Sequence, residues 1–247
     1  MAPEHGWTAA ATLGELAGAV LLLAVFVLTQ RAVRAPLMPL SIWRTPNLAA
    51  ANVAMALLGA AWIPMWYFLN LYLQQVLGYG SFAGGAALVP MTALMMLLMV
   101  GVTGRLIARF GPRPLIVTGL VVLAAGLGVL FTVHPHGGFV TDVLPDSLIS
   151  AVGMALVFIP ATMAAIGGVA PEQGGLASGI VNTTYQIGSA VGLAAMTAIA
   201  TSQGAGALDD PRALTHGFRA AFIGAAVVAL ARCAARPRHP PHARARA

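Results

Sequence analysis

The sequence contains 247 residues, of which 59% are hydrophobic and only 8% carry a charge. A water-soluble domain cannot cover its surface with so few charged side chains, so this composition excludes a soluble protein and predicts an integral membrane protein. The formal net charge of +6 would suit nucleic acid, but every basic residue is an arginine at the end of an apolar stretch, and none joins a basic face, which excludes a nucleic-acid partner.

Long apolar stretches recur along the chain, and a helix needs about 20 apolar residues to cross a bilayer. We expect transmembrane helices over residues 13–28, 48–73, 82–103, 115–133, 144–169, 176–200 and, as a seventh, within 216–235. The charge-free core of the seventh, between Arg219 and Arg232, is too short to span alone, so both arginines must extend toward head groups. The predicted fold is therefore an all-α membrane protein of about seven transmembrane helices.

The arginines are distributed unevenly between alternate loops. The loops after the first and third helices and the segment after the last hold Arg31, Arg34, Arg44, Arg105, Arg109, Arg113, Arg232, Arg236, Arg238, Arg244 and Arg246. The opposite loops hold only Arg212 and Arg219. Because cytoplasmic loops retain the positive charge, we expect a multi-pass protein of the cell membrane with its N-terminus outside and its C-terminus in the cytoplasm.

Two terminal segments allow a second interpretation. The first apolar stretch could belong to a cleaved signal peptide, but such a peptide carries positive charge before its apolar core, and here Glu4 and Glu15 stand instead. A membrane helix is therefore favoured. Residues 236–247 contain no apolar residue larger than alanine, which predicts a disordered basic tail. This tail acts as a topology signal or, in the less favoured alternative, binds anionic lipid.

No group of ionisable residues suited to catalysis is expected at one depth of the membrane. Every Asp and Glu between residues 48 and 200 falls in an expected loop. His134 and His136 have no third or fourth metal ligand nearby, and the single Cys233 forms no cluster. The sequence therefore predicts a protein that is not an enzyme and that has no cofactor or metal.

Uncharged polar residues remain within the expected helices. In the sixth, four of them are spaced by four, four and three residues, which places them on one face, and Thr183 and Tyr185 lie beside them. Such a stripe must face inward, and two interpretations stay open: hydrogen bonds between helices, or the wall of a hydrated substrate path. The candidate path residues are Asn52, Asn70, Gln74, Ser178, Asn182, Tyr185, Gln186 and Ser189.

Glycines and prolines inside the expected helices indicate close helix packing and possible kinks. In the sixth expected helix Gly175 and Gly179, and then Gly188 and Gly192, are each four residues apart, which lets another helix approach closely. Prolines that permit kinks fall inside three expected spans, at Pro64, Pro90 and Pro160.

The turn between the third and fourth expected helices carries the sequence G-R-L-I-A-R-F-G-P-R-P, residues 104–114. It resembles the signature loop of the major facilitator superfamily, in which a glycine is followed by an Asp-Arg pair, a second glycine and basic residues. Gly104, Arg109, Gly111 and Arg113 match this pattern. Ala108 replaces the aspartate and Pro112 the first basic residue, as is usual for the copy of this loop in the second half of these transporters.

Three further segments resemble the second half of one branch, the fourteen-helix drug:proton antiporters. They are R-A-P-L-M-P-L at 34–40, L-Y-L-Q-Q-V-L-G-Y at 71–79 and G-L-A-S-G-I-V-N-T-T-Y-Q-I-G at 175–188. The resemblance extends over about residues 4–222. It implies an extracellular segment at 1–12, a linker helix and cytoplasmic loop at 13–47, a six-helix C-terminal bundle at 48–235 and a tail at 236–247.

This resemblance implies half of an efflux pump that exports small amphipathic compounds in exchange for protons. Alternating access rocks two six-helix halves around a central site, and the coupling acidic residue usually lies in the other half. The expected partners are the lipid bilayer, an amphipathic substrate and a separate N-terminal half of six or seven helices. The alternative is a truncated membrane protein, or a subunit that does not transport without that half.

Overall fold

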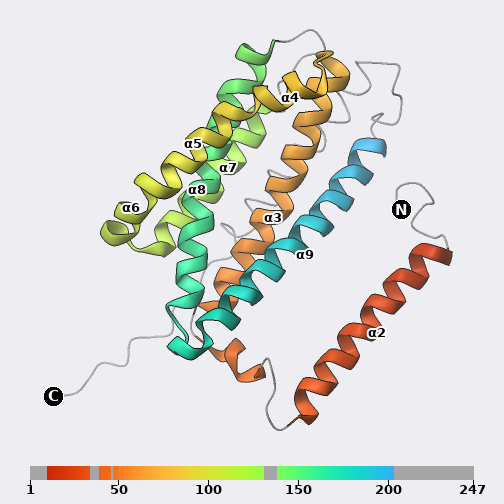
Figure 1. The fold of residues 1–247 in the computed structure, drawn as a ribbon, viewed down its shortest axis with the longest axis vertical. Coiled ribbons are helices and arrows are strands. Elements are labelled where there is room, and N and C mark those ends of the chain that lie inside the picture. Colours follow the sequence, from red (N-terminus) through yellow and green to blue (C-terminus); the bar gives the residue numbers. More distant parts are fainter. Residues whose placement is uncertain (1–9, 34–38, 46, 131–137, 203–247) are drawn as a thin grey trace.

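The computed structural model of the protein describes residues 10–33, 39–45, 47–130 and 138–202. Every regular element within these ranges is a helix (Figure 1), which confirms the predicted all-α membrane fold. Five helical segments are long and apolar enough to cross a membrane, namely 13–32, 48–76, 81–101, 112–129 and 139–166. They coincide with the first five expected spans, and the seventh expected span lies outside the described residues.

The helices follow one another with short connections. In chain order they are α2 (Ala10–Ala32), η1 (Leu40–Arg44), α3 (Leu48–Leu71), η2 (Tyr72–Val76), α4 (Ser81–Ala87), α5 (Val89–Gly101), α6 (Thr103–Phe110), α7 (Pro112–Leu130), η3 (Phe139–Val143), α8 (Leu144–Ile166), η4 (Pro171–Gln173) and α9 (Gly174–Ala200). The sixth expected span is α9. It is long enough to cross a membrane but is not one of the five apolar segments, because polar side chains and glycines dilute its apolar residues.

Proline acts differently at its three positions inside the expected spans. Pro90 lies in the first turn of α5, where its missing N–H costs nothing, and the third expected span is divided there into α4 and α5. A second break at Val102, with φ of −116°, separates α5 from α6. Pro64 and Pro160 instead lie inside α3 and α8, which both continue past them.

Two pairs of helices approach each other at backbone distance. A Cβ atom at Gly188 of α9 would lie 2.2 Å from the carbonyl oxygen of Ala56 of α3, and one at Gly192 would lie 2.4 Å from the Cα of Ala60. These contacts advance in the same direction along both helices, so α3 and α9 run parallel (Figure 1). Such close approach maximises the van der Waals contact that holds membrane helices together.

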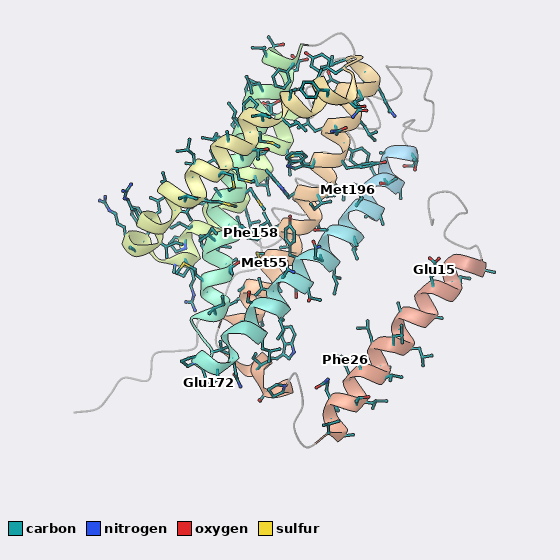
Figure 2. All side chains as sticks on the ribbon, in the orientation of Figure 1. Glu15, Phe26, Met55, Phe158, Glu172 and Met196 are labelled. Atoms are coloured by element: carbon teal, nitrogen blue, oxygen red, sulfur yellow. The ribbon has the colours of Figure 1, made fainter. Side chains whose placement is uncertain are left out.

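The second pair is α7 and α8, which run antiparallel. A Cβ at Gly119 would lie 2.9 Å from the carbonyl oxygen of Gly153, and one at Gly126 would lie 2.9 Å from the amide nitrogen of Ser150. Further α8 contacts with α3 and α5 join the two pairs into one bundle. Met55 of α3 is fully buried, and Figure 2 places it with Phe158 of α8 in the central part of this bundle.

Helix α2 stands apart from the other helices in Figure 1. Its apolar side chains are exposed along its length, and Leu22 and Val20, for example, retain 70% and 66% of their accessible surface. Figure 2 shows Phe26 and Glu15 projecting from this helix without a neighbouring helix beside them. An apolar helix surface of this kind suits lipid or another protein segment within the membrane.

Candidate substrate path and signature segment

The polar stripe of α9 divides between a buried and an exposed part. Ser189 is 7% exposed and its Oγ donates a hydrogen bond to the carbonyl oxygen of Tyr185, 2.8 Å away. Ser178 is half-buried, whereas Asn182 and Gln186 are exposed. Ser189 therefore lies in the interface with α3, whereas the side-chain amides of Asn182 and Gln186 point away from the described helices.

Tyr185 joins α9 to α8. Its ring meets the ring of Phe158 edge-on, with centroids 5.8 Å apart and planes at 89°. This edge-to-face geometry is the favourable one for aromatic pairs. Tyr185 thus packs between helices while its neighbours Asn182 and Gln186 remain exposed.

The three candidate path residues in α3 and η2 do not lie around one common site. Asn52 is 3% exposed, and its Nδ2 donates to the carbonyl oxygen of Leu48 at 2.9 Å, while its Oδ1 has no hydrogen-bond partner among the described residues. Asn70 accepts a hydrogen bond from the side chain of Gln74, one turn further on, in the π-helical η2. Asn52 and Asn70 lie about 27 Å apart along the helix axis, so one small molecule cannot touch both.

The four glycines named from the sequence occupy two environments. Gly188 and Gly192 lie against the backbone of α3, as described above. Gly175 and Gly179 have no atom within 4 Å of an added Cβ. Sequence spacing alone did not single out their partner Gly59 on α3, where a Cβ would lie 2.3 Å from the carbonyl oxygen of Tyr185 and 2.7 Å from Ser189 Oγ.

The signature segment, residues 104–114, is largely helical. Gly104 and Arg109 belong to α6, and the turn is confined to Gly111, whose φ of +78° lies in the left-handed region that favours glycine. Arg109 places its guanidinium 5.3 Å from the centroid of the Phe110 ring. Arg113, in the first turn of α7, donates a hydrogen bond from Nη2 to the Oδ1 of Asn47.

A buried acidic residue escaped the sequence analysis, which placed every Asp and Glu between residues 48 and 200 in a loop. That expectation was wrong for Asp146, which lies in the first turn of α8 and is 4% exposed. The preceding Pro145 was the available signal, because proline followed by an acidic residue is typical of a helix start. One turn further on, Ser150 is fully buried and its Oγ has no partner among the described residues.

No group of three or more His, Cys, Asp and Glu side chains able to hold a metal ion occurs within the described ranges. His134, His136 and Cys233 lie outside them. What the described residues offer is therefore uncharged polarity on α9 and α3, together with one buried carboxyl on α8.

Known proteins resemble this chain over most of its length. It is 35% identical to a cephamycin export protein of Amycolatopsis lactamdurans over 92% of this chain and 46% of that protein. It is 34% identical to a tetracenomycin C resistance and export protein of Streptomyces glaucescens over 82% of this chain and 37% of the relative. A puromycin resistance protein of Streptomyces alboniger is 30% identical over 84% of this chain and 42% of its own length.

The chain thus spans less than half the length of each of these three relatives. The family model described as the Major Facilitator Superfamily matches residues 3–192 and also residues 102–247. These matches confirm the resemblance first indicated by the segment at 104–114 and show that the chain belongs to the Major Facilitator Superfamily.

Proposed function

We propose that this chain is the C-terminal part of a proton-coupled exporter of small amphipathic compounds, in which α9 lines the substrate path. Three relatives whose names state export of, or resistance to, antibiotics support a role in export, and so does membership of a transporter family. The resemblance to fourteen-helix drug:proton antiporters supports protons as the driving ion. A carrier of this kind is not an enzyme.

The observation that carries the proposal is the exposure of Asn182 and Gln186 in the middle of α9. Gln186 lies about 18 Å from the start of a helix about 40 Å long, and so near the centre of a bilayer. An amide exposed to lipid at that depth loses its hydrogen bonds to water, which is costly. Asn182 and Gln186 therefore face a hydrated path or a second protein segment.

The proposal includes a second bundle, because the chain matches less than half the length of each of the three relatives. Alternating access requires two bundles that rock around a central site, and the described residues contribute to one of them. We assign residues 48–235 to this bundle, 13–47 to the linker helix with its loop, 1–12 to an outer segment and 236–247 to a cytoplasmic tail. The arginine distribution supports an outer N-terminus and a cytoplasmic C-terminus.

The test is accumulation of puromycin in a bacterial host that lacks its own drug exporters. The host expresses the chain alone, or together with the part of the cephamycin export relative that this chain does not match. We expect lower accumulation in the paired case. No decrease in either case contradicts export and favours the alternative of a membrane protein that does not transport.

A matched set of α9 variants tests the path separately. The double variant Asn182→Leu/Gln186→Leu is expected to remove the decrease in accumulation while its amount in the membrane stays unchanged. Val191→Leu, on the same helix and 64% exposed, is the control and should keep full export. Unchanged export by the double variant would contradict the assigned path without contradicting export itself.

A further inference from the structure

The short helix α6 carries two arginines, and within the part of the chain that the structure describes neither has an acidic partner. Arg105 and Arg109 are both exposed and stand four residues apart, which places them one turn apart on the same face. Like charges at this spacing repel each other and destabilise a helix. A negative group beside both guanidinium groups would reverse that repulsion.

Among the described residues, no Asp or Glu side chain forms an ion pair with Arg105 or Arg109. No Asp or Glu occurs in the sequence between Glu15 and Asp142. Among the described residues, Arg105 donates from Nη1 to the carbonyl oxygen of Gly101 at 3.1 Å, and Arg109 lies beside the Phe110 ring. Most of the guanidinium donors thus remain available to an external acceptor.

The opposite face of α6 is apolar and only partly covered. Leu106 and Ile107 are half-buried against the bundle, but Phe110 remains 55% exposed. A helix with arginine on one face and an uncovered aromatic ring at the end of the other suits the boundary between head groups and acyl chains. In Figure 1, α6 lies at the edge of the bundle that is remote from α9 and α2. It is therefore remote from the face to which we assign the substrate path.

We propose that Arg105, Arg109 and Phe110 form a binding site for the head group of an anionic phospholipid. The two guanidinium groups contact the phosphate, for which planar arginine donors are well suited, and Phe110 inserts beside the acyl chains. Arg113 is not part of the site, because it belongs to α7, beyond the turn at Gly111, and not to the face of α6 that carries Arg105 and Arg109. The proposal is independent of whether the chain transports anything.

The experiment places a reporter at the site. The variant Phe110→Trp keeps an aromatic ring, and the purified chain is reconstituted in phosphatidylcholine vesicles that contain a small fraction of brominated lipid. Bromine quenches tryptophan at short range, and the unaltered chain supplies the background from its other tryptophans. We expect brominated phosphatidylglycerol to quench Trp fluorescence at this position far more than brominated phosphatidylcholine, with a preference of about fivefold for each arginine.

Three further variants, each combined with the reporter, decide the interpretation. Arg105→Gln/Arg109→Gln should lose the preference for phosphatidylglycerol. Arg105→Lys/Arg109→Lys should retain most of it, and this result would show that the loss in the glutamine variant comes from the missing charge and not from misfolding. Arg31→Gln removes an exposed arginine at the end of α2 and should leave the preference intact. Equal quenching by the two lipids in the reporter chain overturns the proposal. So does loss of the preference on adding inorganic phosphate at constant ionic strength, because the site then takes free phosphate.

Discussion

The Nη2 atom of Arg113, at the start of α7, donates a hydrogen bond to the Oδ1 of Asn47, at the start of α3. Asn47 has a φ of 71° and is the single non-glycine residue in the left-handed region among those described. Asparagine tolerates this conformation better than other residues with a side chain. The signature segment is thereby tied to the helix that forms the centre of the bundle.

Replacing Asn47 tests this tie. Asn47→Ala should lower the free energy of unfolding by about 1–2 kcal/mol, because it adds left-handed strain and removes the acceptor. Asn47→Gly should cost less, because glycine relieves the strain. Unfolding by SDS titration in mixed micelles measures both. In a double-mutant cycle with Arg113→Ala we expect a coupling of about 0.5–1 kcal/mol. A coupling of zero would show that the hydrogen bond contributes nothing.

Composition and apolar run length were sufficient to predict the helices, because a bilayer demands about 20 apolar residues whatever their packing. The division of the third span was harder to predict, since it depends on whether Pro90 begins a helix or kinks one. The glycine spacing of α9 predicted a close approach, but the assignment to Gly188 and Gly192 required the position of α3. Spacing cannot distinguish these residues from Gly175 and Gly179.

Asp146 and the polar residues of α9 show a second limit of prediction from the sequence. Periodicity put Ser189, Asn182 and Gln186 on one face, yet the rotation of α9 against α3 buries the first and exposes the other two. That outcome depends on the contact of α9 with α3 around Gly188 and Gly192, which no local sequence signal fixes. Asp146 was assigned to a loop with the other acidic residues, whereas it lies in the first turn of α8, where its backbone packs against Gly126 of α7.

The glycines of α9 should respond very differently to the same substitution. Gly188→Ala would place its Cβ against the Ala56 carbonyl oxygen, so we expect a loss of about 1–3 kcal/mol in the free energy of unfolding through overpacking. Gly179→Ala meets open space and should raise that free energy by a few tenths of a kcal/mol, because alanine is the better helix former. SDS unfolding of both variants decides the matter, and equal effects would contradict the α3–α9 contact.

Two buried serines form a second matched pair. Ser189 Oγ donates to the Tyr185 carbonyl oxygen, whereas Ser150 Oγ has no partner among the described residues. Ser189→Ala should therefore lower the free energy of unfolding by about 0.5–1 kcal/mol, and Ser150→Ala should leave it unchanged or raise it. A large loss for Ser150→Ala, measured by the same titration, would indicate that this hydroxyl has an acceptor.

Asp146 offers the last test, because its carboxyl is buried in the first turn of α8 and no described residue forms an ion pair with it. Burying an unpaired charged group costs more than burying a neutral amide of the same shape. Asp146→Asn should therefore raise the thermal unfolding midpoint of the purified chain, by an amount equivalent to roughly 1 kcal/mol. Glu172→Gln, at an exposed carboxyl in η4, is the matched control and should leave the midpoint unchanged. A lower midpoint for Asp146→Asn would mean that the carboxylate has a stabilising partner, and the buried group would then be a structural ion pair rather than a source of instability.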